Sequence, residues 1–269
     1  MALLIGIALL VLIVIGGSIA ALLSSGGKLA SSPATPTVAP ANATTTAAAH
    51  ETATITSALT ATVQANATAT ASVIAANPNP YPPGDGTLAL YDPLRDNSKG
   101  YRWDEGSSAT GSCAFSGNTY HVSTPRTHFF VTCSSNASDF SNFVFEAQMQ
   151  IINGDCAGLI FRANSTIGKF YLFQVCKDGA VRLYLYLDYS GNHVTTLATT
   201  SSSAVVTGLN QTNVLAVIAR GKALDFYVNK NKSMSVNDGT FTHGQIGFVA
   251  SAANNPTEVM YSNTRVWTL

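Results

Sequence analysis

The chain has 269 residues and no formal net charge, because 14 Lys and Arg balance 14 Asp and Glu. Thirteen residues of each sign fall in residues 82–269, together with all four cysteines and both tryptophans. A neutral domain lacks the basic footprint that nucleic-acid binding requires, so no nucleic-acid partner is expected. This part of the chain is long enough to form one domain with its own core.

The amino terminus is uncharged and apolar: residues 2–23 read ALLIGIALLVLIVIGGSIAALL. Such a run is long enough to cross a bilayer as a helix, and we expect a membrane anchor over residues 1–24. A cleaved signal peptide is one alternative, although it would have a basic start and a shorter apolar core. A hydrophobic helix that packs into an assembly is another, and the pair Gly16 and Gly17 would allow close approach.

Residues 25–82 form a stalk of Ala, Thr, Ser, Asn and Pro, a composition that cannot bury a core. A lone helix and a disordered chain both fit, because Ala favours helix and Thr disfavours it. Lys28 favours a cytoplasmic position for the chain after the anchor, whereas paired cysteines favour an oxidising space. We expect a single-pass protein whose domain, residues 83–269, lies outside the cell with the stalk as a spacer.

After the turn-rich stretch NPNPYPPGDG, short alternating or apolar runs are each bounded by turn residues, which is typical of strands. Strands are expected at 87–92, 109–115, 118–123, 127–133, 143–152, 155–163, 169–177, 180–188, 193–198, 213–220, 223–229, 231–236, 244–250 and 257–267. No run has a helical period. The domain is therefore expected to be all-β, with two packed sheets.

The cysteines help to set one hairpin. Direct pairing of Cys156 with Cys176 across two antiparallel strands collects the intervening apolar side chains on one face, which supports a disulfide. The same register places opposite each other Gly158 and Gln174, Ile160 and Leu172, and Arg162 and Phe170. Cys113 and Cys133 have the same separation and are expected to form a second disulfide, although four cysteines allow three connectivities. Zinc is the alternative, but no Cys-x-x-Cys spacing is present.

Together, the segments LYDPLRDNSKGYRWDEG, GLIFRANSTIGKFYLFQVCKDGAVRLYLY, NVLAVIARGKALDFYVNK and GQIGFVASAANNPTEVMYSNTRVW resemble the concanavalin A-like lectin/glucanase jelly rolls. The similarity is greatest to the laminin-G-like and 3-keto-disaccharide-hydrolase-like domains, and it covers about residues 86–269. The resemblance implies a two-sheet jelly-roll sandwich whose first strand lies beside its last. It also implies a membrane-anchored bacterial surface protein with carbohydrate as ligand.

The stretch FVFEAQMQI alternates and places Glu146, Gln148 and Gln150 on one strand face. Jelly-roll glycanases have Glu-x-Asp-x-Glu at this spacing. Glycoside hydrolysis needs two carboxyl groups roughly 5 to 9.5 Å apart, and an amide cannot replace one, although it can hydrogen-bond a sugar hydroxyl. The pattern therefore resembles a non-hydrolytic version of that of the glycanases, and an ordinary solvated strand face is its main interpretation. The alternatives are a sugar contact through this face, and an enzyme in which Glu146 gains a second carboxylate from a loop.

Further candidate ligand-binding residues are aromatic or basic. Tyr184, Tyr186 and Arg182 share one face of the expected strand 180–188, where the rings could stack on sugars. Arg162 is a candidate for the same sheet face, although a structural salt bridge is the main interpretation of this residue. Trp103 is a candidate sugar platform, although a Trp after the first strand is more often a core residue.

No cofactor is expected, and the alternative is Ca²⁺ bound by Asp104 and Glu105 with Asp96 or Asn97. No nucleotide loop, Gly-x-Ser-x-Gly motif or histidine ligand pattern is present. The sequence therefore favours an extracellular, membrane-anchored, non-catalytic module for carbohydrate binding, adhesion or sensing. The alternatives are a glycoside hydrolase-like enzyme that uses Glu146, and a surface protein that binds a protein partner or assembles with itself.

Overall fold

A computed structural model describes residues 58–65, 68, 72, 73 and 77–269. The expected membrane anchor at residues 2–23 and most of the stalk lie outside these residues. The described stalk residues 58–65, 68, 72 and 73 are helical. Within the described part of the chain, no helix is both long and apolar enough to cross a membrane.

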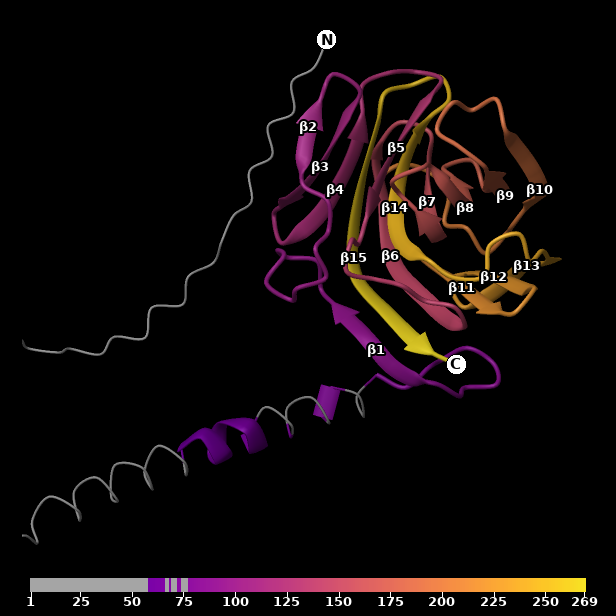
Figure 1. Cartoon of the computed structure of the whole chain (residues 1–269). Helices are drawn as coiled ribbons and strands as arrows, with labels where there is room; N and C mark the ends of the chain where they lie inside the picture. Colours follow the sequence, from indigo (N-terminus) through magenta and orange to yellow (C-terminus); the bar gives the residue numbers. More distant parts are fainter. Residues whose placement is uncertain (1–57, 66–67, 69–71, 74–76) are drawn as a thin grey trace, which may run out of the picture. The chain divides into compact units, whose positions relative to one another are not determined.

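Strands make up nearly all of the regular structure between residues 77 and 269 (Figure 1). In chain order they are β1 (Thr87–Asp92), β2 (Gly106–Ser108), β3 (Gly111–Ser116), β4 (Thr119–Thr124), β5 (Phe129–Ser134), β6 (Phe143–Asn153), β7 (Cys156–Asn164), β8 (Lys169–Cys176), β9 (Ala180–Tyr186), β10 (Val194–Ser201), β11 (Thr212–Arg220), β12 (Ala223–Val228), β13 (Asn231–Asn237), β14 (Gln245–Ala252) and β15 (Thr257–Thr268). The expected strands are all present, and β2 was not predicted because its Gly and Ser residues have no apolar alternation.

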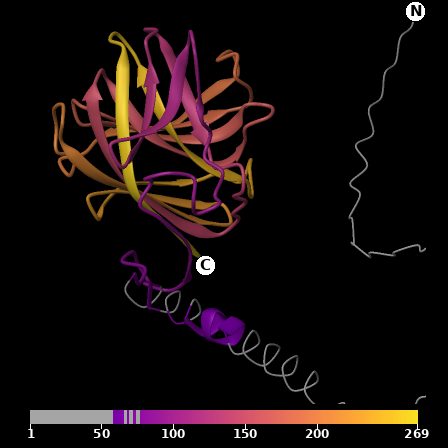
Figure 2. The same ribbon diagram turned by 90° about the vertical axis from the view of Figure 1, so that its left-hand side faces the viewer.

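The strands form two antiparallel sheets that face each other as the layers of a sandwich (Figure 2). The nine-stranded sheet has the order β13-β12-β11-β6-β15-β4-β3-β2, with β1 paired to β15. The six-stranded sheet has the order β10-β9-β8-β7-β14-β5. The first strand therefore lies beside the last, as the resemblance implied.

The inner faces of both sheets supply the core. On β6, alternate residues from Phe143 to Ile151 are buried against the facing sheet, which explains the alternation of the sequence. The ring of Phe248 on β14 stacks on Tyr261 of β15 at 4.3 Å and on Trp103 at 4.9 Å between ring centroids. These aromatic contacts join the two layers near their centre.

Both predicted disulfides are confirmed. Cys156–Cys176 joins neighbouring strands of the six-stranded sheet, and Cys113–Cys133 links β3 to β5, one strand from each sheet. The predicted register is confirmed where Gly158 opposes Gln174 and Ile160 opposes Leu172. The predicted pairing of Arg162 with Phe170 is wrong, because the register shifts between Phe161 and Asn164.

Candidate functional site

The outer face of the six-stranded sheet has an aromatic surface. On β9, Val181, Leu183 and Leu185 are buried in the core, whereas Arg182, Tyr184 and Tyr186 alternate with them and are half-buried on the other side. Tyr186 stacks on Phe170 of β8, with ring centroids 4.7 Å apart, and meets Tyr184 edge to face at 6.2 Å. The three predicted β9 residues thus share one face.

This face of the sheet is curved inward. Phe130 lies on β5 and Tyr186 on β9, with three strands between them. Strands in a flat sheet would place them about 19 Å apart, at the usual inter-strand spacing. Their ring centroids are 5.0 Å apart, and Phe130 also meets Phe170 at 6.0 Å. Rings from such distant strands meet only because the strands between them lie at the bottom of a hollow.

The bottom of the aromatic cluster is apolar and closed. Ile160, Leu172 and Val249 are each at most 1% exposed, and they pack under the half-buried rings of Phe130 and the two tyrosines. Their contacts fix the rings in position before any ligand arrives, which lowers the entropy that binding would cost.

Tyr186 combines this packing with a polar group. Burial, followed by the neighbouring Tyr184, raises the pKa of Tyr186 to about 12. The phenol therefore keeps its proton throughout the physiological range and can both donate and accept a hydrogen bond.

A polar rim borders the rings. Gln174 on β8 donates from Nε2 to Oγ of Ser251 at 3.0 Å and accepts at Oε1 from Nη1 of Arg182 at 3.4 Å. These residues, together with His128 and the rings of Phe130, Tyr184 and Tyr186, line a hollow of about 450 Å³. Aromatic rings beside a few fixed polar groups are typical of ligand sites. We name this hollow, lined by Arg182, Tyr184, Tyr186, Phe130, Gln174, His128 and Ser251 among others, the β9 hollow.

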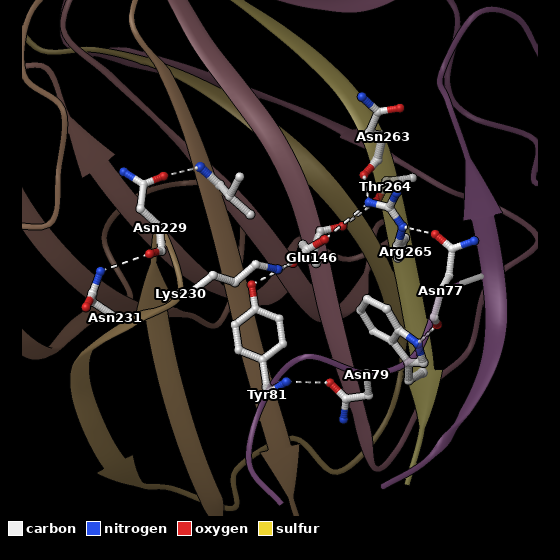
Figure 3. Close-up of polar contacts among 12 residues, drawn as sticks. Asn77, Asn79, Tyr81, Glu146, Asn229, Lys230, Asn231, Asn263, Thr264 and Arg265 are labelled. Atoms are coloured by element: carbon white, nitrogen blue, oxygen red, sulfur yellow. Dashed lines mark hydrogen bonds and ion pairs between the residues drawn. The ribbon is translucent and has the colours of Figure 1, made fainter. Parts of the chain in front are cut away.

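Glu146 lies on the outer face of the other sheet and is only 4% exposed (Figure 3). Tyr81 donates to Oε2 at 2.7 Å, Arg265 donates to Oε1 at 3.3 Å, and Lys230 forms an ion pair with Oε2. Burial, followed by the Glu146 carboxylate, raises the pKa of Tyr81 well above its ordinary value, so the phenol keeps its proton. The carboxylate is thus covered by the segment that precedes β1.

That segment is attached at several points. Asn77 accepts from Nε of Arg265 at 2.7 Å and, through its main-chain carbonyl, from the Trp267 indole at 2.8 Å (Figure 3). The ring of Tyr81 meets Tyr227 edge to face at 5.1 Å. Residues 77–81 therefore pack on the nine-stranded sheet over the position where the sequence suggested a sugar-contacting face.

The neighbours of Glu146 on the same strand are also paired within the protein. Gln148 accepts from Nδ2 of Asn263 at 2.8 Å and from Oγ of Ser262 at 3.2 Å, and Gln150 donates to the carbonyl of Asn210 at 2.9 Å. Each is half-buried rather than covered. The structure places this group of three on the opposite side of the sandwich from Tyr184 and Tyr186.

Two more candidates are buried. Arg162 is 2% exposed and donates to the carbonyls of Ser141, Gly221 and Phe241, so it ties three loops together. Trp103 is 3% exposed in the core and donates its indole N–H to Asp92 at 2.9 Å. Of the candidates from the sequence, the β9 hollow therefore brings together Arg182, Tyr184 and Tyr186.

The remaining residues of the β9 hollow were not found from the sequence. Phe130, Gln174 and Ser251 come from three other strands, and only the curvature of the sheet brings them near β9. One local feature of the sequence could have pointed to them, the adjacent pair Phe129 and Phe130. In the structure this pair lies on an edge strand and is partly exposed.

The oxygens suggested for Ca²⁺ accept hydrogen bonds from the protein. Asp104 accepts from the main-chain N–H of Ser134 at 2.8 Å and from Asn136 at 2.6 Å, and Asp96 accepts from Ser98 at 2.8 Å. Among the described residues, no group of three His, Cys, Asp or Glu side chains is arranged to hold a metal ion.

A second hollow, of about 670 Å³, lies among the loops at one end of the sandwich. Its charged side chains are largely engaged: His243 pairs with Asp139 at 2.8 Å, and Arg162 binds loop carbonyls. Among the described residues that line it, Phe241 is the one Phe, Tyr or Trp. It therefore offers less of the stacking surface that distinguishes the β9 hollow.

Comparison with solved structures identifies the architecture. A carbohydrate-binding module, CBM66 from Bacillus subtilis, matches with a TM-score of 0.51 and 17% identity over 62% of this chain and 96% of that chain. The domain has the concanavalin A-like jelly-roll fold. A Bacillus subtilis protein of unknown function with a galectin-like fold also matches, with a TM-score of 0.51 and 15% identity over 67% of this chain and 96% of the other. The jelly roll predicted from the sequence is thus confirmed.

Comparison of the sequence itself with known proteins finds no match. No family model matches the chain, and no curated protein matches it. The likeness to the solved structures concerns the fold, because identities of 15–17% do not carry the roles of individual residues.

Proposed function

We propose that the domain is a non-catalytic carbohydrate-binding module and that the β9 hollow is its binding site. The observation that carries this proposal is the convergence of Phe130, Tyr184 and Tyr186 beside the polar groups of Gln174 and Arg182. The buried ring of Phe170 stacks on Tyr186 and supports it. Sugar rings have apolar faces that pack on aromatic rings and hydroxyls that need fixed donors and acceptors. The likeness to a carbohydrate-binding module is consistent with this assignment.

The positions of the carboxylates favour a domain that binds sugar without cleaving it. Hydrolysis requires a pair of carboxyl groups on either side of the bond that is cleaved. Of the described residues that line the β9 hollow, none is Asp or Glu. Glu146, the other candidate, contacts two cations and a phenol beneath a covering segment.

We further propose that residues 2–23 anchor the protein in a membrane and that the domain lies outside the cell. The apolar run and the two disulfides support this location. Protease treatment of intact cells tests it: an external domain is released or degraded, and a domain protected until lysis would contradict the proposal.

The binding function is tested by retention of the full chain on immobilised polysaccharides and isolated cell walls, with released sugar assayed in the same tubes. A detergent without a sugar headgroup should be used for solubilisation. We expect retention without release of sugar. Tyr184→Ala combined with Tyr186→Ala should weaken retention by roughly tenfold or more, because two stacking rings are lost.

The matched control is Tyr91→Ala, which removes a half-buried tyrosine from the other sheet. It should leave retention unchanged. Tyr184→Ala alone provides a milder variant, since Tyr186 also packs on Phe170. The proposal would be contradicted if the wild type, Tyr184→Ala and the double variant of Tyr184 and Tyr186 were retained equally, or if sugar were released.

A further inference from the structure

The β9 hollow has basic side chains in and beside it and no acidic one among its described lining residues. Of the described residues that line it, Arg182 is basic, His128 carries an imidazole, and none is Asp or Glu. A second guanidinium lies beside it, because Arg126 sits over the ring of the lining residue Phe129 at 4.9 Å. The domain as a whole is neutral, so this concentration of basic groups is a local property of the hollow.

Nearby carboxylates do not neutralise the basic groups. Asp188, two residues beyond Tyr186, pairs with His193 and accepts from Ser190 at the end of the hairpin. Asp155, beside Cys156, accepts from Asn254 and Asn255 and pairs with Lys177 at 3.3 Å. In the described part of the chain, neither carboxylate forms an ion pair with Arg182 or Arg126.

Arg182 has unused donors. Within the described residues, its side-chain hydrogen bonds are donated by Nη1, to Oε1 of Gln174 at 3.4 Å and to Sγ of Cys176 at 3.1 Å. A guanidinium has five N–H donors in a planar fork, so Nε and Nη2 have no acceptor among the described residues. The contact with Gln174 and Cys176 holds the side chain in place, which prepares the fork for an incoming acceptor.

The spacing on β9 relates this fork to the rings. Arg182, Tyr184 and Tyr186 occupy alternate positions, so successive side chains stand about 7 Å apart along one face. A polymer lying along the strand would meet two rings and then a cationic fork. A guanidinium fork fits a carboxylate with two parallel hydrogen bonds, which a neutral hydroxyl cannot match.

We propose that the ligand is an acidic polysaccharide whose sugar carboxylate binds Arg182 while the adjoining sugar ring packs on Tyr184 and Tyr186. This inference rests on the proposed function and specifies its ligand class. The guanidinium fork supplies the selection for charge, and the rings supply the contact common to all sugars. Arg126 adds favourable charge at the rim.

The test compares acidic polymers with matched neutral ones. Three uronic-acid polymers, polygalacturonate, alginate and hyaluronan, are immobilised beside their methyl esters, which keep the backbone and remove the charge. Dextran sulfate beside dextran provides a polymer with another anionic group. The affinity of the full chain is measured in a sugar-free detergent at two salt concentrations, since screening should weaken the charged contact.

Three variants accompany the wild type. Arg182→Gln removes the charge, and Arg182→Lys keeps the charge but loses the fork. Lys222→Gln removes a positive charge from the exposed turn between β11 and β12. Thermal unfolding of each variant shows whether the domain remains folded.

The expected result is that at least one uronic-acid polymer binds at least tenfold more tightly than its ester. Arg182→Gln should remove most of the preference for the acid, and Arg182→Lys should keep more of it than Arg182→Gln but less than the wild type, because bonds to charged groups are stronger than those to neutral ones. Lys222→Gln should bind as the wild type does.

Other results overturn the inference in distinguishable ways. Equal binding of acid and ester, unchanged in Arg182→Gln, rejects the acidic ligand but leaves the carbohydrate-binding function standing. Preference for dextran sulfate alone rejects the carboxylate. Equal loss of acid and ester binding with a lower unfolding temperature assigns Arg182 a structural role. Retention of none of these polymers rejects the inference, and the wider glycan panel then decides the proposed function.

Discussion

Asp155, in the turn between β6 and β7, holds one end of the β9 hollow, and its replacement by Asn should make stability depend on pH in a defined way. Its carboxylate accepts from the main-chain N–H groups of Asn254 and Asn255 at 2.7 and 2.8 Å. The Asn255 side chain donates at 2.8 Å, and Lys177 pairs with it at 3.3 Å. These bonds fix the turn that comes after Ala252 and Ala253, which line the hollow.

The pKa of the Asp155 carboxyl group gives the size of its contribution to the free energy of unfolding. Desolvation by burial acts to raise it, but the hydrogen bonds from Asn255, Asn254 and Lys177 prevail and lower the pKa of Asp155 from 3.8 to about 2. A carboxyl group whose pKa is lower in the folded state than in the unfolded chain stabilises the protein at pH values above its pKa in the unfolded chain. The contribution is about 2 kcal/mol at neutral pH, and it is lost as the pH falls from about 4 through about 2.

The assay is urea unfolding of the wild type and Asp155→Asn with the disulfides intact, from pH 7 to pH 2. The variant should be less stable by about 2 kcal/mol at pH 7, and the difference should shrink below pH 4. The control is Asp139→Asn, which removes an exposed ion pair with His243 and should cost less than about 1 kcal/mol. A variant as stable as the wild type at pH 7, or a difference that persists unchanged at pH 2, would refute the reasoning.

Three further predictions separate structural residues from the binding face. Glu146→Gln leaves Lys230 and Arg265 without their carboxylate and should lower the free energy of unfolding by about 3 kcal/mol, measured in urea, while glycan retention of the folded variant stays unchanged. Arg162→Met should cost about 2 kcal/mol or more, because three loop carbonyls lose a charged donor, and hydrogen exchange in those loops should accelerate. Replacing Cys156 and Cys176 together by Ala should lower stability by about 3 kcal/mol in the same urea assay, given the 20-residue separation of the disulfide.

The strands and the Cys156–Cys176 hairpin could be predicted because their signals are local. Alternation and turn residues mark each strand. The register that places the two cysteines opposite each other also places the apolar residues on one face of the hairpin. The predicted pairing of Arg162 with Phe170 was wrong for a local reason as well. The bulge before Asn164, with a φ of 46° at Arg162, turns the side chain away from the pairing that simple alternation implies.

The surroundings of the candidate residues depend on contacts far apart in the sequence. Glu146 stands at the right place for a solvent-facing residue of its strand, but Tyr81, 65 residues earlier, covers it. Lys230 and Arg265 arrive from other parts of the chain. In the same way, Phe130 meets Tyr186 only through the curvature of the whole sheet. Local pattern could suggest that β9 has a polar and aromatic face, but not which strands complete it.

The central claim is that a glycan binds the outer face of the six-stranded sheet. Hydrogen–deuterium exchange of the full chain, with and without the best-retained polysaccharide fragment, tests it most directly. The account predicts slower exchange over residues 180–186 and 128–130, with no change over 146–150. Protection of residues 146–150, or of the loops around Asp139 and His243, with none on β9, would contradict it.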